Sequence, residues 1–253
     1  MAIKRYDATQ DNTITNAFKA DLRTKATGSN MGASDILETF VIHGQTSASI
    51  SAQNAEEARI LIQFDLNKIG SDRSAGTIPA SGSVNFYLKM FNAEHADTTP
   101  ENLTLDVKIL SASWDEGRGL DMENYTDIGK CNWVSASSTT AWATTGSDYH
   151  ALAAVNNFSG SVTFVKGNED LELEVTPAVE NWLAGTKTNY GFLLKQTEAA
   201  ITGSSGSLFT KMFHGRSTEF VMQKPVIEAR WDDSRKDQRG SFILSSSVLS
   251  SEN

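Results

Sequence analysis

Cysteine is nearly absent from this sequence, which contains one, Cys131, among 253 residues. A single cysteine excludes a disulfide bond within the chain and a zinc site built from cysteine pairs. Long apolar runs are absent as well, and none approaches the ~20 residues of a membrane-spanning helix. No charged-then-apolar signal segment follows Met1. We therefore predict a chain made in a reducing cytoplasm, with no membrane partner.

Positive charge is scarce. The formal net charge is −9, because 31 acidic residues outnumber 22 basic ones. A nucleic-acid-binding surface needs a basic stripe that replaces counterions on phosphate. The sequence predicts no nucleic-acid partner.

The residue patterns of common enzyme sites are also missing. The four histidines, at positions 43, 95, 150 and 214, are scattered without metal-ligand spacing. There is no nucleophile elbow, no glycine-rich phosphate loop and no cysteine–histidine arrangement. A lone cysteine in a loop is predicted to be an inert thiol. We predict a non-enzymatic protein without a cofactor.

What the sequence does contain is a succession of strand patterns. Leu171, Leu173 and Val175 alternate with glutamates, as in a half-buried strand. Thr176-Pro177 then predicts a capped helix over about Pro177 to Ala184, which Gly185 ends. Later strands are expected over residues 192–194, 209–213, 220–222 and 225–231.

The first half of the chain carries more of these patterns. Alternating residues predict strands over 84–90 and 103–109, and residues 36–42 form another apolar run. Residues 60–64 are apolar on both faces, which indicates a central strand, and Gly/Ser/Pro-rich residues 70–82 are expected to be a linker. Arg59 and Asp65 are interpreted as a sheet-edge ion pair or turn cap. Together these patterns predict an all-β fold, an antiparallel sandwich over residues 35–231 with one short helix.

Both ends are polar. Residues 1–34 are expected to be an N-terminal arm with a first strand, and residues 232–253 a linker and tail. The segment Ile14 to Thr27 is either an arm that packs on a neighbour or a long hairpin.

The periodicity is lost from Trp114 to Asn168, a long insertion rich in aromatic residues, and a strand is expected to resume only near its end, at Val162 to Val165. A structureless loop of this length inside a compact domain needs a function or a partner. We expect Trp114, Trp133 and Trp142 to anchor it on one end of the sandwich. The alternative is a glycan platform, in which Trp133, Trp142 and Tyr149 stack on sugar rings.

Acidic residues gather in the same insertion, at Asp115, Glu116, Asp121, Glu123 and Asp127. Calcium binds several oxygen ligands from a flexible loop, so Asp115, Glu116 and Asp121 are weak calcium candidates. The spacing does not match the twelve-residue calcium loop, and a solvated acidic loop is the preferred interpretation. No metal site is predicted.

The stretch from Val175 to Gly185, followed by Asn189 to Lys195, resembles the second half of DNRLRE-type domains. Residues 213–219 and 224–231 are similar to the closing strands of that family, and residues 58–69 to its most recognisable strand. The resemblance implies a jelly-roll sandwich related to carbohydrate-binding modules of secreted and surface proteins. It also implies that the strands over 84–90 and 103–109 are neighbours in one sheet.

The insertion carries a second resemblance. Residues 114–125 and 129–137, with Trp142 and 146–149, resemble a variant of this domain in virion structural proteins of tailed bacteriophages, and residues 212–240 extend the likeness. It implies a non-enzymatic virion protein at the neck, tail or fibre-attachment region. Its partners would be other virion proteins, in a homo-oligomer or symmetric ring joined through the arms Met1 to Thr27 and Asp232 to Asn253. The alternatives are a carbohydrate-binding module or a capsid decoration protein that contacts host glycans through Trp133 and Trp142.

Overall fold

The computed structural model describes residues 1–43, 55–94, 99–122, 127, 129–150, 158–202 and 209–234. Within these residues the chain forms ten strands, all paired antiparallel: β1 (Ala2–Thr15), β2 (Ile36–Ile42), β3 (Glu56–Phe64), β4 (Asn85–Met90), β5 (Leu103–Ile109), β6 (Ser159–Phe164), β7 (Leu171–Glu174), β8 (Phe192–Gln196), β9 (Phe209–His214) and β10 (Val226–Trp231). Short helices connect them: α1 (Leu66–Ser74), α2 (Thr176–Leu183), α3 (Glu198–Thr202) and the 3-10 turn η1 (Val221–Gln223).

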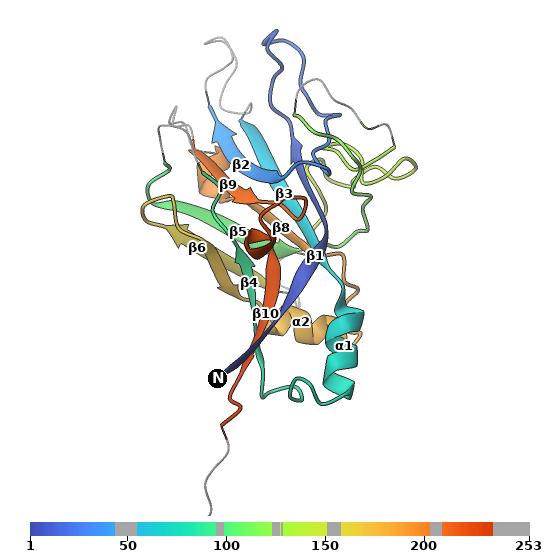
Figure 1. Cartoon of the computed structure of the whole chain (residues 1–253). Helices are drawn as coiled ribbons and strands as arrows, with labels where there is room; N and C mark the ends of the chain where they lie inside the picture. The colour runs from blue at the N-terminus through green and yellow to red at the C-terminus, as the bar shows by residue number, and fades with distance from the viewer. Residues whose placement is uncertain are drawn as a thin grey trace, which may run out of the picture.

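The strands form two layers that share β1 (Figure 1). Layer A has the order β1-β10-β4-β7, and layer B has the order β1-β3-β8-β5-β6. Residues 2–7 of β1 pair with β10, and residues 8–15 pair with β3 after a register shift between Ala8 and Gln10. Strands that turn a sandwich corner commonly change sheets at such an irregularity. The all-β sandwich predicted from the sequence is confirmed.

Strands β2 and β9 nearly close the structure on its other side. β2 pairs with the start of β3, and β9 pairs with β2. Phe213 of β9 then forms a bridge to Asn92, just beyond β4. Backbone hydrogen bonds from Ala93 to Met212 and from His214 to Phe91 hold this seam. Layers A and B are therefore connected at both β1 and β9.

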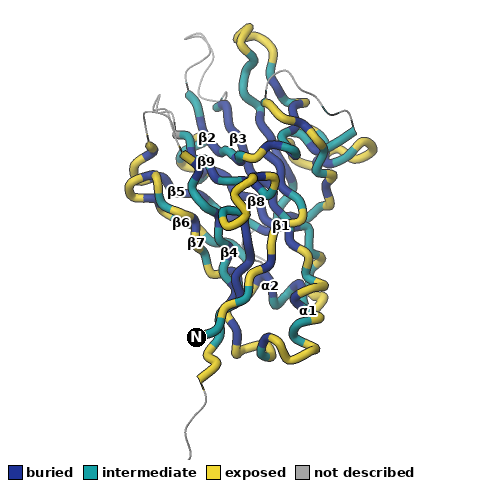
Figure 2. Tube along the Cα trace, in the orientation of Figure 1, coloured by how far each residue is buried: buried dark blue, intermediate teal, exposed yellow. Residues whose placement is uncertain are grey.

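The main core lies between the layers. It contains the fully buried rings of Phe64, Phe86, Phe164, Phe192 and Phe213. Figure 2 shows burial concentrated along the strands and exposure at the loops. The ring of Trp182 from α2 packs on Phe192 with centroids 4.8 Å apart, so the helix covers one end of this core.

A second core lies on the outer face of layer B. Ile14 of β1, Leu61 of β3 and Leu193 of β8 point away from the main core. Residues 60, 62 and 64 of β3 point inward. Apolar residues on both faces of β3 therefore reflect two cores, and the expectation of a central strand is confirmed.

Helices α1 and α2 lie together at the end of the molecule where the chain begins (Figure 1). Arg73 of α1 binds both carboxylate oxygens of Glu180 of α2, at 2.6 and 2.9 Å. Tyr6 of β1 donates to Asp72 at 2.8 Å. The expected linker over 70–82 was therefore partly wrong, because α1 occupies residues up to 74. The interpretation of Asp65 as a cap is confirmed, since its side chain accepts from the backbone N–H of Asn67.

The helix expected over Pro177 to Ala184 is confirmed as α2, with one difference at its start. The Thr176 hydroxyl is not a helix cap; it accepts a hydrogen bond from the backbone N–H of Phe86. Gly185 follows the helix with φ +72°, a conformation that favours glycine.

Three other expectations were wrong. The strands over 84–90 and 103–109 are not neighbours, because β4 lies in layer A and β5 in layer B. The strand expected over 220–222 is not formed, because residues 221–223 are the 3-10 turn η1. Residues 2–15 are no arm, because β1 is an interior strand that pairs on both sides. Asp11, Asn12 and Thr13 form hydrogen bonds to other segments, so their polarity does not mark a loop. Within the proposed tail, residues 235–253 lie outside the described part.

Deleting residues 1–15 is expected to abolish the cooperative thermal unfolding transition, because β1 joins the two layers. Circular dichroism during heating provides the measurement. The control is deletion of residues 235–253, since all the strands and both cores of the described part of the chain lie within residues 2–231. A chain without residues 1–15 that unfolds at the temperature of the intact protein would contradict this assignment.

Candidate interaction surface

Tryptophans attach the insertion to the outer face of layer B, and not to one end of the sandwich as expected. Trp114, Trp133 and Trp142 are all buried in the second core. The indole N–H of Trp114 donates to the carbonyl of Tyr190, and that of Trp142 to the carbonyl of Asn132, each at 2.9 Å. Buried aromatic rings with satisfied N–H groups are what the anchoring interpretation requires.

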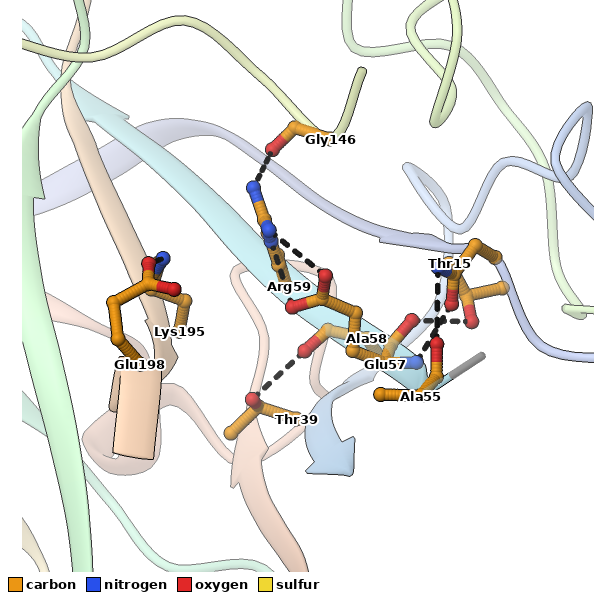
Figure 3. A network of polar contacts seen from close by, with 10 residues as sticks. Thr15, Thr39, Ala55, Glu57, Ala58, Arg59, Gly146, Lys195 and Glu198 are labelled. Atoms are coloured by element: carbon orange, nitrogen blue, oxygen red, sulfur yellow. Dashed lines mark hydrogen bonds and ion pairs between the residues drawn. The ribbon is translucent and has the colours of Figure 1, made fainter. Parts of the chain in front are cut away.

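Arg59 of β3 is the main polar anchor beneath the insertion (Figure 3). It binds the two carboxylate oxygens of Glu57 at 2.8 and 3.1 Å and donates to the carbonyl of Gly146 at 2.6 Å. Its guanidinium lies 4.8 Å from the ring centroid of Trp133. A Cβ at Gly146 would lie 2.8 Å from Arg59 Nη1 and 2.8 Å from Trp133 Cζ2, so this position requires glycine. Arg59 is thus in an ion pair, but with Glu57 and not with Asp65, and this pair is buried on a central strand and not at a sheet edge.

Asn30 fixes the start of the insertion. Its amide nitrogen donates to the carbonyls of Glu116 and Cys131 at 2.7 and 2.8 Å. Its amide oxygen accepts from the backbone N–H groups of Gly32 and Gly119 at 3.0 and 2.8 Å. All four bonds are made to backbone groups of two loops. The Asn30 side chain therefore satisfies backbone groups that strand pairing would satisfy in a regular sheet.

A charged junction connects the insertion to β1 and to the loop after β9. Arg216 binds both carboxylate oxygens of Glu116, at 2.7 and 2.5 Å. Glu116 also accepts from the backbone N–H of Asp11 at 2.7 Å, and Asp11 accepts from the backbone N–H of Arg216 at 2.5 Å. The pKa of Asp11 is raised to about 7, mainly by burial and to a smaller extent by the negative charge of Glu116, while the hydrogen bond and the charge of Arg216 act in the opposite direction.

The weak calcium candidates are engaged elsewhere or dispersed. Both oxygens of Glu116 are bound to Arg216, and Asp115 lies 3.9 Å from the ammonium of Lys130. Asp121 forms a backbone bridge with Asn30, and Glu123 lies outside the described residues. Among the residues that the structure describes, no group of three or more His, Cys, Asp or Glu side chains is placed to hold a metal ion. Burial raises the pKa of Cys131, so its thiol is not activated.

The glycan platform is not on the surface. Trp133 and Trp142 are buried, and the Lys195 ammonium lies 5.3 Å from the ring centroid of half-buried Tyr149. Stacking on a sugar needs an open ring face, and the two tryptophans present none. The structure therefore does not favour the glycan-binding alternative.

The exposed apolar surface is elsewhere, in the loop between β9 and β10. Phe220, Val221 and Met222 are 54%, 72% and 72% exposed. Beside them is a groove of about 560 Å³, lined by Asn92, Glu94, Thr99, Asn168, His214, Phe220 and Gln223. The rings of Phe220 and His214 meet edge to face at 5.7 Å. We call Phe220 to Gln223 with this groove the apolar corner.

Sequence reasoning missed the apolar corner because it assigned residues 220–222 to a strand. Pro225 and the flanking Gly215 to Thr218 turn were available signals for a loop. Three consecutive apolar residues were nonetheless more typical of a short buried strand.

A scan against models of known protein families and a search of curated proteins both found no match. In the described part of the chain, no helix has the length and apolar character needed to cross a membrane.

Replacing Arg59 by methionine is expected to lower the free energy of unfolding by about 3–5 kcal/mol, because it leaves the buried Glu57 carboxylate unpaired. Urea denaturation measures the change. Lys130→Met is the control: its ion pair with Asp115 is about half exposed and contributes less than about 1 kcal/mol. Adding Glu57→Gln to Arg59→Met is expected to restore part of the loss. Equal effects of Arg59→Met and Lys130→Met would contradict this role.

Asp11 gives the protein a distinctive dependence on pH. Its pKa is higher in the folded chain than the usual value of 3.8, so the folded state retains a proton that the unfolded state has lost. The contribution of Asp11 to stability is therefore greatest below about pH 4 and decreases as pH rises to about 7, by at most roughly 4 kcal/mol. Urea denaturation of the protein and of Asp11→Asn at pH 5, 6, 7 and 8 isolates this contribution. If the difference between the two is constant over this range, Asp11 does not titrate as described.

Proposed function

We propose that this chain is a non-enzymatic structural protein of a tailed-phage virion and that it joins its neighbours through the apolar corner. The observation that carries the proposal is the exposure of Phe220, Val221 and Met222 in one short turn. Contiguous exposed apolar surface with a polar rim is typical of protein–protein contacts. The rim here contains Glu94, Asn168 and Gln223.

The position of this turn supports a role in assembly. It begins after the Gly215 to Thr218 turn, which is held by the hydrogen bond from Arg216 to Asp11 and by that from Gly215 to the carbonyl of Asp35. It ends at β10, an interior strand of layer A. The apolar corner is therefore held on both sides. Binding a partner then costs little conformational entropy in this loop, because the loop is already ordered.

The motif that carries the phage resemblance has a structural role consistent with the proposal. Trp114 packs the insertion against layer B, and Gly117 and Gly119 let it approach Asn30 closely. Glu116 binds Arg216 at the base of the apolar corner. The ion pair between Glu116 and Arg216 thus fixes the insertion and the contact loop to each other, so the chain presents a defined shape to its neighbours. The contact surface proposed here replaces the N-terminal arm, which is β1.

The test is incorporation into particles. During infection by the phage that encodes this chain, a tagged copy supplied in trans is expected to appear in gradient-purified particles, as detected by mass spectrometry. A variant with Phe220, Val221 and Met222 changed to serine is expected to remain folded and to be at least tenfold depleted, because the apolar contact is lost.

Its matched control changes three separate exposed residues, Leu22, Leu120 and Val165, to serine. This control is expected to enter particles normally. Absence of the unmodified chain from particles would overturn the virion assignment. Normal incorporation of the 220–222 variant would overturn the contact surface.

A further inference from the structure

Lys211 of β9 is a fully buried lysine, with a side-chain exposure of 0%. Its ammonium nitrogen lies 4.6 Å from the ring centroid of Phe164 and 5.1 Å from that of Phe213. Two aromatic rings on one amine exclude water from it.

No carboxylate pairs directly with this amine in the described structure. Its nitrogen donates to the carbonyl oxygens of Gly167 and Glu169, each at 2.8 Å, and to the side-chain oxygen Oδ1 of Asn92. A buried ammonium that binds only neutral oxygens retains its full charge at a high desolvation cost. Burial accordingly lowers the pKa of Lys211 to about 8, although Glu169 and Asp170 partly oppose this effect.

Asn92 is held against the amine from its own side. It follows β4 and bridges to Phe213, two residues from Lys211. Its backbone N–H donates to Asp170 Oδ1 at 2.8 Å, and its side-chain nitrogen donates to the carbonyl of Ala93 at 2.9 Å. The amine and the carboxamide are thus fixed together, although 119 residues separate them in sequence.

The carboxylate of Glu169 belongs to the same surroundings, and its charge acts to raise the pKa of Lys211. Glu169 follows β6, its carbonyl accepts from Lys211, and its side-chain oxygen Oε2 is buried with no hydrogen-bond partner in the described structure. Its other oxygen accepts from the backbone N–H of Lys166 at 2.8 Å. The hydrogen bond from the Lys166 backbone lowers the pKa of Glu169, so this group is a carboxylate that can accept a proton. An amine, a carboxamide and a carboxylate in one neighbourhood have the chemical functions needed for amide exchange.

We propose that Lys211 and Asn92 form an isopeptide bond within the chain. The ammonium of Lys211 first gives one proton to Glu169. The free amine attacks Cγ of Asn92, and a new bond forms between Nζ and Cγ. A proton then moves from Nζ to Nδ2, the Cγ–Nδ2 bond breaks, and ammonia leaves. The proton on Glu169 finally leaves with the ammonia as ammonium, so no oxidant, reductant or second substrate is needed.

The bond would join two parts of the seam between the layers. Asn92 continues β4 of layer A, and Lys211 lies on β9, which is connected to layer B through β2. Asn92 and the neighbouring His214 also line the groove of the apolar corner. A covalent link at this place fixes the strand that leads into the contact loop. The inference is independent of the proposed function, because it concerns one chain alone.

The first experiment is the mass of the purified, denatured protein. We expect it to be lower than the sequence mass by one ammonia molecule. Trypsin is expected to release residues 90–108 linked to residues 196–216, with no cleavage after Lys211. Intact mass equal to the sequence mass, together with separate peptides ending at Lys108 and Lys211, would overturn the proposal.

Lysine labelling in the same denatured sample provides an internal control. Lys195 is also buried, but its ammonium pairs with the carboxylate of Glu198. Reductive methylation after unfolding is expected to modify Lys195 fully and Lys211 not at all. Full modification of both would mean that Lys211 is only an ammonium bound to carbonyl oxygens.

The variants Asn92→Ala and Lys211→Arg are expected to have the full mass calculated from their sequences. Each is also expected to unfold at a lower temperature than the unmodified chain. A mass deficit that persists in both would place the loss of ammonia elsewhere in the chain and overturn the assignment to this pair.

Discussion

The structure depends on one constraint: layer B is apolar on both faces. Leu61 and Leu193 point outward from the two central strands, and Ile14 from β1 adds to the same surface. Each such side chain contributes roughly 1.5–3 kcal/mol when it is fully buried. A sandwich buries only its inner faces, so this outer surface needs a cover. The insertion supplies that cover through its tryptophans, and its length follows from this task.

Covering an outer sheet face with irregular chain creates a second requirement, because irregular backbone leaves N–H and C=O groups unpaired. The side chains of Asn30, Arg59 and Glu116 meet this requirement by binding backbone groups of distant segments. These polar side chains lie at the junctions between the insertion, β1 and the loop that carries the apolar corner. These junctions bury charged side chains, and each charged group is satisfied only when the loops align in one way. The buried charge therefore favours a single alignment of the loops.

Local patterns predicted the elements whose surroundings match their own sequence. The alternation in β4 and β5 and the Thr-Pro start of α2 were sufficient, because one face or one stripe is apolar in each. β1 was predicted as part of an arm because Asp11, Asn12 and Thr13 are polar. They are nonetheless buried, and these partners are 19 or more residues away. α1 has a single buried residue, Ile69, so no amphipathic period marks it. The site residues shared this difficulty: no local signal joins Asn92 to Lys211 or Glu116 to Arg216.

The two buried lysines, Lys195 and Lys211, differ in how the charge of the ammonium is compensated. Lys195 lies beside Glu198, and the opposite charge of the carboxylate compensates for burial of the ammonium. Lys211 has carbonyl and carboxamide oxygens instead, which bear partial charges only. Burial in low dielectric disfavours a charged group, and it does so more when the partner is neutral. Loss of the proton removes the charge of Lys211, but it leaves an amine that donates fewer hydrogen bonds to the fixed carbonyls. Conversion to an amide removes the charge permanently, retains one N–H donor, and replaces a costly buried ion by a neutral link across the seam. The surroundings of Lys211 therefore favour the covalent state over either protonation state of the free side chain.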